Sequence, residues 1–141
     1  MMQVYFLSII YLLLGAGFLL SDSYGIKFAL LLSLRYAFRT SKRFRRILIF
    51  SGLLLTVLLC FFPMDPGPVL LGDLLPLINV FSLTVWFLFQ AVKHVSDAQD
   101  SDENSVLEAT GLYFERNKRN FGYVTCLVSL LHFFVPFSVL L

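Results

Sequence analysis

Four long apolar segments limit what this chain can fold into. They span residues 4–20, 47–62, 74–92 and 121–141, and contain 17, 16, 19 and 21 residues. About 20 helical residues are needed to cross a bilayer's hydrocarbon core. Inside lipid each segment must satisfy its own backbone hydrogen bonds, which a helix does, and the alternating pattern of a membrane barrel is absent. The sequence therefore predicts four transmembrane helices.

Composition agrees with lipid as the main solvent of the chain. Of its 141 residues, 58% are hydrophobic and only 14% are charged, whereas a soluble domain has about 25% charged residues. We therefore expect one integral membrane domain over residues 1–141, an all-α polytopic helical bundle. One or two interfacial amphipathic helices are expected beside the four transmembrane helices.

The cations are confined to two of the connections between these segments. Residues 21–46 hold seven of the eleven Lys and Arg, residues 93–120 hold the other four, and the connection 63–73 has only Asp65 and Asp73 as charged residues. Because cationic loops stay in the cytoplasm, both long loops are predicted to be cytoplasmic. The N- and C-termini are then predicted to lie on the outer side.

The segment 26–38 admits two interpretations, because Lys27 and Arg35 interrupt an otherwise apolar run. As a helix continuing to Arg46, it would place Arg35, Arg39, Lys42 and Arg46 on one face, since they are spaced by four, three and four residues. That pattern favours an amphipathic helix in the membrane interface. The alternative is a tilted fifth span, which would put the N-terminus inside.

The cationic cluster is the first candidate for a binding function. Each cation near a membrane surface attracts anionic lipid with about 1 kcal/mol. We expect contacts with anionic lipid headgroups or an acidic partner, although the same charges could serve only to fix the topology. The candidate residues are Arg35, Arg39, Lys42, Arg43, Arg45 and Arg46.

The acidic stretch of the second long loop begins like a calcium-binding loop and then departs from it. Asp100, Asp102 and Asn104 have the spacing of its first three ligands, but Gly111 stands where a bidentate Glu is required. Ser105 and Glu108 instead form a capping box that opens a helix. No CxxC pair or group with metal-ligand spacing is visible, so we expect no metal and no cofactor.

Polar residues recur at helical spacing inside the last two segments. They are interpreted mainly as seams between packed helices, with a substrate path as the alternative. If these segments are antiparallel neighbours of matched depth, His132 near the middle of its span lies opposite Ser82. The candidate intramembrane polar contacts are Asn79, Ser82, Gln90, Ser129 and His132.

For function, the sequence favours a small non-catalytic subunit or scaffold of a larger membrane complex. One alternative is an oligomeric small transporter or channel, with Asn79, Gln90 and His132 lining its path. A second is a lipid-handling enzyme, although no acid, base or metal site is visible for it. Expected partners are membrane lipids, mainly anionic headgroups, and other membrane subunits or further copies of the chain. No nucleic-acid partner is expected.

Overall fold

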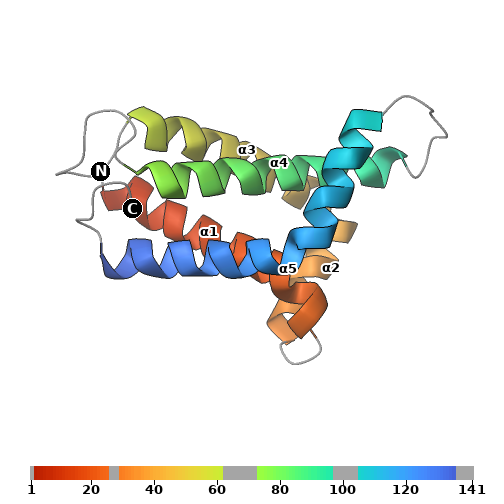
Figure 1. Ribbon diagram of the computed structural model, residues 1–141, viewed down its shortest axis with the longest axis horizontal. Helices are drawn as coiled ribbons and strands as arrows, with labels where there is room; N and C mark the ends of the chain where they lie inside the picture. The colour runs from red at the N-terminus through yellow and green to blue at the C-terminus, as the bar shows by residue number, and fades with distance from the viewer. Residues whose placement is uncertain (1, 26–28, 62–72, 97–104, 136–141) are drawn as a thin grey trace.

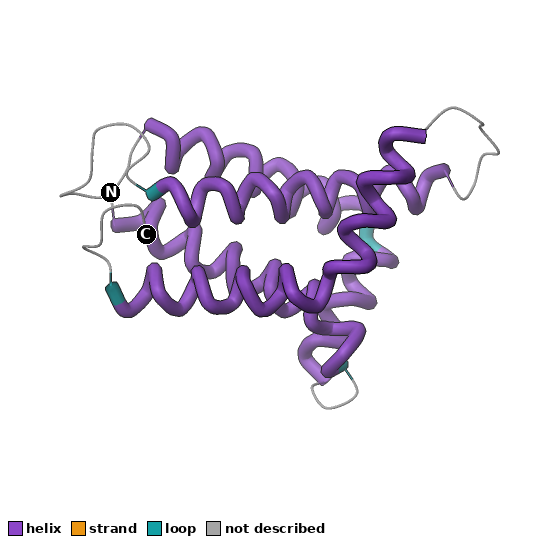
Figure 2. The backbone as a smooth tube through the Cα atoms, viewed as in Figure 1, coloured by secondary structure: helices purple, strands orange, loops and turns teal. Residues whose placement is uncertain are grey.

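The computed structural model describes residues 2–25, 29–61, 73–96 and 105–135, and in these ranges the chain forms five helices and no strand (Figures 1 and 2). The all-helical fold predicted from the sequence is therefore confirmed. The helices are α1 (Met2–Tyr24), α2 (Ala29–Thr40), α3 (Lys42–Phe61), α4 (Leu74–Ser96) and α5 (Ser105–Phe134).

Three of these helices are long and apolar enough to cross a membrane. The candidate spans are Gln3–Tyr24 in α1, Lys42–Phe61 in α3 and Leu74–Val92 in α4. The fourth predicted span, 121–141, coincides with the second half of α5 as far as Phe134, and residues 136–141 lie outside the described residues. The first half of α5 is the helix that the capping box at Ser105 predicts. One 30-residue helix therefore joins a charged half to an apolar half.

The sequence predicts one continuous helix through the cationic cluster. This prediction is wrong in one respect, because the helix is broken at Ser41. Thr40 ends α2 and Lys42 begins α3, while the Ser41 hydroxyl accepts a hydrogen bond from the Phe44 N–H at 3.3 Å. This is the arrangement of an N-terminal capping serine. With 12 residues, α2 is only about 18 Å long, too short to cross a core of about 30 Å.

The two ends of the bundle differ in the elements that they gather (Figure 1). The beginning of α1 and the end of α5 lie together at one end. At the other end lie α2, the start of α3, the last turns of α4 and the first half of α5. We call the latter the basic end, because the described arginines and Lys118 belong to its elements. α1 packs most extensively against α5, and α3 against α4.

The core between the helices is closely packed around a hydrogen-bonded contact. The Tyr11 hydroxyl donates to the Leu48 carbonyl at 3.2 Å and lies 3.2 Å from the Thr84 hydroxyl. Gly52 of α3 faces this contact, and a Cβ there would lie 2.2 Å from both the Tyr11 and Thr84 oxygens. Only a residue without a side chain fits, which brings α3 close to α1 and α4.

Candidate functional site

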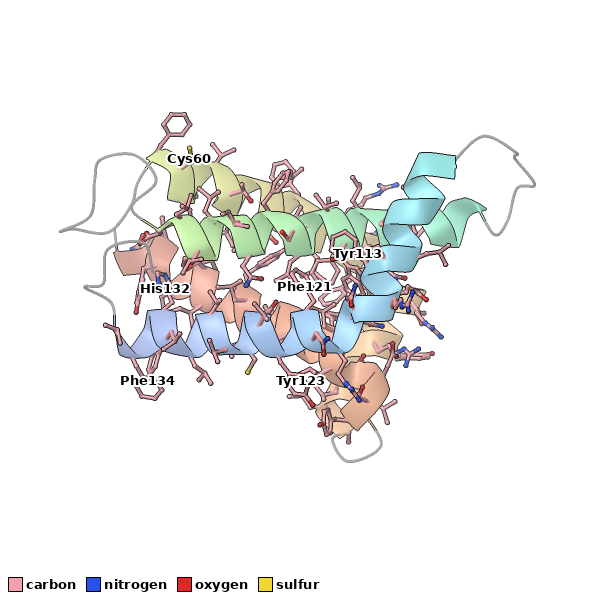
Figure 3. All side chains as sticks on the ribbon, in the orientation of Figure 1. Cys60, Tyr113, Phe121, Tyr123, His132 and Phe134 are labelled. Carbon is pink, nitrogen blue, oxygen red and sulfur yellow. The ribbon has the colours of Figure 1, made fainter. Side chains whose placement is uncertain are left out.

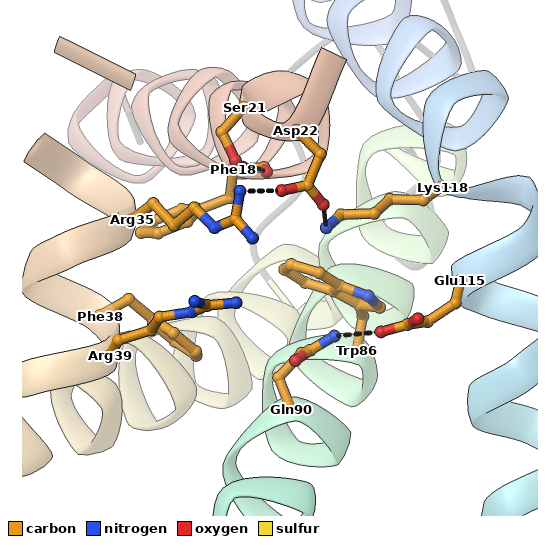
Figure 4. Close-up of a pocket in the computed structure, with 10 residues that line it drawn as sticks. All are labelled: Phe18, Ser21, Asp22, Arg35, Phe38, Arg39, Trp86, Gln90, Glu115 and Lys118. Atoms are coloured by element: carbon orange, nitrogen blue, oxygen red, sulfur yellow. Dashed lines mark hydrogen bonds and ion pairs between the residues drawn. The ribbon is translucent and has the colours of Figure 1, made fainter. Parts of the chain in front are cut away.

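A cavity of about 470 Å³ opens at the basic end of the bundle (Figure 4). This volume is within the range of about 300–1,000 Å³ found for small-molecule sites. Four helices contribute to its wall: α1, α2, α4 and α5. The lining residues are Phe18, Ser21, Asp22, Arg35, Phe38, Arg39, Trp86, Gln90, Glu115 and Lys118.

Helical spacing explains how each element presents its polar groups to the cavity. On α2, Arg35 and Arg39 are four residues apart, and on α4 the same spacing separates Trp86 from Gln90. Residues four apart lie on one face of a helix, one turn above the other. Each helix therefore turns a pair of side chains toward the same space.

Asp22 is the charged centre of one side of the cavity. Its carboxylate forms ion pairs with both Arg35 of α2 and Lys118 of α5 (Figure 4). The Asp22 side chain is 38% exposed, so these pairs are partly hydrated and each contributes little to stability. They do, however, hold the Arg35 guanidinium and the Lys118 ammonium group against the same carboxylate.

The other side of the cavity is formed by α4 and α5. The Gln90 side-chain amide donates to the Glu115 carboxylate at 3.4 Å. The Lys118 ammonium lies 5.3 Å from the centre of the Trp86 ring, which is within cation–π range. Lys118 therefore links the ion pair at Asp22 with the aromatic wall.

That wall is continuous with the apolar core. The Phe18 ring lies 5.3 Å from those of Phe38 and Phe87, and the Trp86 ring is 5.1 Å from Phe87, between ring centres. These separations fall within the range of favourable aromatic pairs. The cavity thus has charged groups around its opening and aromatic rings toward the bundle interior.

Two hydrogen-bond donors of the cavity have no acceptor among the described residues. The Trp86 side chain is buried, at 4% exposure, and its Nε1 has no hydrogen-bond partner there. The Arg39 guanidinium forms none of the ion pairs found in this part of the chain. With three cations and two carboxylates in its lining, the cavity has a net charge of one positive unit.

The cationic residues proposed from the sequence separate into two groups in the structure. Arg35 and Arg39 line the cavity, whereas Lys42, Arg43, Arg45 and Arg46 belong to the first turns of α3 and are outside its lining. The expected single face from Arg35 to Arg46 is wrong, because the break at Ser41 divides it. Asp22, Glu115 and Lys118 also line the cavity, although no pattern in the sequence marks them as parts of a site.

The polar residues proposed inside the membrane also occupy different surroundings. Thr125 donates to the Asn79 side-chain oxygen at 2.9 Å between α5 and α4, and the Ser129 hydroxyl donates to the Ile9 carbonyl of α1 at 3.3 Å. Ser82 donates to Ile78 of its own helix. Gln90 lies in the cavity. These residues therefore take part in separate contacts.

His132 is not opposite Ser82, so the predicted register of α4 and α5 is wrong. The Asn79–Thr125 hydrogen bond fixes that register, and His132 follows Thr125 by seven residues, or about 10 Å along the helix. In an antiparallel neighbour this depth corresponds to the start of α4, at Asp73. His132 is fully buried in the last turn of α5 (Figure 3). Its ring centre is 4.6 Å from that of Tyr5.

The polar groups of the cavity are suited to binding an anion. Both carboxylates have cationic or amide partners. The Arg39 guanidinium lines the open space, and Trp86 forms part of its wall with a buried side-chain nitrogen. Within the described ranges, no three His, Cys, Asp or Glu side chains are grouped so as to hold a metal ion. The arrangement can hold an anionic group that accepts hydrogen bonds.

No curated protein and no solved structure matches this chain. A protein-family pattern does match, and it covers residues 1–132, nearly the whole sequence. The function of that family is unknown. The chain belongs to this family of unknown function.

Proposed function

We propose that this protein is a small multi-pass membrane protein that acts as a non-catalytic subunit or scaffold of a membrane complex. The observation that carries the proposal is the outward face of α3. Six large apolar side chains along this helix are exposed, and together they form a row on the side away from the bundle. They are Ile47, Phe50, Leu53, Leu54, Val57 and Phe61.

A groove on this face supports a protein partner in addition to lipid. It has a volume of about 580 Å³ and is lined by Arg46, Ile47, Ile49, Phe50, Ser51, Leu53 and Leu54. α3 is also the least enclosed of the three candidate spans, with 22% of its most apolar stretch buried against 50% for α1. Membrane helices associate by close packing, and a grooved, unpartnered face offers the surface for it.

The proposal includes four crossing helices, the fourth being the second half of α5. It is supported by the extent of the contact with α1: Gly122 lies beside Leu19 and Leu20, and the Tyr5 hydroxyl donates to the His132 carbonyl. Over this stretch α5 therefore follows nearly the full length of α1. An even number of spans keeps both termini on the outer side and the basic end in the cytoplasm.

Labelling tests this orientation. A cysteine replacing Ser41, in a chain whose Cys60 and Cys126 are changed to alanine, should resist membrane-impermeant reagents in intact cells. It should react after the membrane is opened. An added tag at the N-terminus should be reached by antibody from outside. Labelling of Ser41→Cys in intact cells would contradict the orientation.

Photo-crosslinking tests the scaffold role. A photoreactive amino acid at Phe50, on the exposed face of α3, should form a crosslink to a different membrane polypeptide. The matched control is Leu127, which is 57% exposed on α5 and should react with lipid alone. Crosslinks from Phe50 only to a second copy of the chain would support an oligomer and oppose the subunit proposal. Lipid adducts alone at both positions would also oppose it.

A further inference from the structure

The Arg39 guanidinium lines the cavity at the basic end and forms none of the ion pairs found among the described residues. It offers up to five N–H donors. A ligand that satisfies them must supply several acceptor atoms, and the net positive charge of the lining favours an anion.

Asp22 shows what kind of group the cavity accommodates. Its carboxylate already receives Arg35 and Lys118 together, so the helices are placed for two cations to meet one oxyanion. A phosphate group resembles a carboxylate in this respect and offers more acceptor oxygens. Arginine matches phosphate well, because its planar guanidinium can donate two parallel hydrogen bonds.

The position of the cavity favours a lipid as the source of that phosphate. The cavity lies where the apolar helices α1 and α4 reach their charged ends, and its inner wall is formed by Phe18, Phe38 and Trp86. Charged groups at the opening and rings toward the core suit a molecule that is polar at one end. Basic pockets between membrane helices are known sites for anionic headgroups, and a cavity of about 470 Å³ has the size for one headgroup.

We propose that this cavity binds the phosphate group of an anionic phospholipid. Arg39 donates to the phosphate oxygens, and the Trp86 ring forms part of the cavity wall beside them. Arg35 and Lys118 are shared between the phosphate and Asp22, which acts as an internal competitor. This site is separate from the α3 face and does not depend on a protein partner.

Trp86 makes the test direct, because it is the single tryptophan of the chain. The purified full chain in an uncharged sugar detergent is titrated with phosphatidylglycerol, and Trp86 fluorescence is followed. A saturable change is expected with phosphatidylglycerol. Phosphatidylcholine, whose phosphate is neutralised by its own cation, should give little change at the same mole fractions.

The variants separate a built site from general surface charge. Arg39→Gln should raise the half-saturating lipid fraction about tenfold, and Arg39→Lys should give a smaller increase because the paired hydrogen bonds are lost but the charge remains. Arg43→Gln removes the same charge from α3 outside the cavity and should change binding less than about twofold. Asp22→Asn should lower the half-saturating fraction several-fold, because Arg35 and Lys118 are released. Circular dichroism confirms that each variant is folded.

Native mass spectrometry gives a second readout that does not depend on fluorescence. It should show several-fold less phosphatidylglycerol bound to Arg39→Gln than to the unchanged chain, and nearly the same amount bound to Arg43→Gln. Equal losses of phosphatidylglycerol binding for Arg39→Gln and Arg43→Gln would overturn the proposed site. So would a response to phosphatidylcholine equal to that for phosphatidylglycerol. A saturable Trp86 response to inorganic phosphate or to an acidic peptide, with none to lipid, would overturn the lipid assignment.

Discussion

Polar side chains in the middle of the bundle and at its basic end are used in different ways. In the middle, Tyr11, Thr84 and Thr125 are buried and bonded to groups on neighbouring helices, at distances of 2.9–3.2 Å. At the basic end, partly exposed ion pairs surround an open cavity, and Arg39 and Trp86 retain unused donors. The first arrangement fills space between helices, whereas the second leaves space between them.

This difference distinguishes polar residues that determine stability from polar residues that are available for binding. A buried polar group must have its partner, because losing one leaves a desolvated donor or acceptor behind. A partly hydrated ion pair can be lost at little cost, because water replaces the partner. Substitutions in the middle of the bundle should therefore change unfolding, and those at the basic end should change ligand binding with little effect on unfolding.

The largest effect is expected at Gly52, where helix α3 meets the Tyr11–Thr84 contact. Gly52→Ala places a Cβ 2.2 Å from two oxygens, so the helices must separate, and we expect a loss of about 1–3 kcal/mol in the free energy of unfolding. Unfolding by a denaturing detergent, followed by circular dichroism, measures it. The control is Gly17→Ala, whose Cβ would meet only Leu31 at 3.2 Å. Equal stability of the two variants would contradict the close packing at Gly52.

A smaller effect is expected at the hydrogen bond between α4 and α5. Thr125→Val keeps the shape of the side chain and leaves the Asn79 oxygen without its donor, which should cost about 1 kcal/mol. A double-mutant cycle with Asn79→Leu should give a coupling energy of about 0.6 kcal/mol, as for other interhelical hydrogen bonds in membranes. Ser82→Ala is the control, because Ser82 bonds only within its own helix. A coupling energy of zero would show that this hydrogen bond does not stabilise the contact between α4 and α5.

Features that depend on neighbouring residues in the sequence could be predicted. The apolar runs predict α1, α3 and α4 because a helix in lipid satisfies its own backbone groups. The capping box at Ser105 likewise predicts the start of α5. The break at Ser41 was missed because Lys42 and Arg43 continue the helical pattern of charges, although a serine is a known capping residue.

Features that depend on the pairing of distant helices could not be predicted. Arg35 and Arg39 are recognisable from their spacing, but their cavity also needs Asp22 and Lys118, which are 96 residues apart in the sequence. The predicted position of His132 relative to α4 was wrong for a related reason. The prediction matched the ends of the apolar segments, whereas the Asn79–Thr125 bond sets the relative position of α4 and α5.

The smallest effect on stability is expected at Asp22, although it joins three helices. Asp22→Asn removes two ion pairs whose aspartate side chain is 38% exposed, and such pairs contribute roughly 0–1 kcal/mol each, many of them nothing measurable. Because salt screens exposed charges, the difference from the unchanged chain should shrink further at high ionic strength. Unfolding of both proteins at low and high salt measures this. A loss as large as that of Thr125→Val, and independent of salt, would show that the basic end is held together like the middle of the bundle.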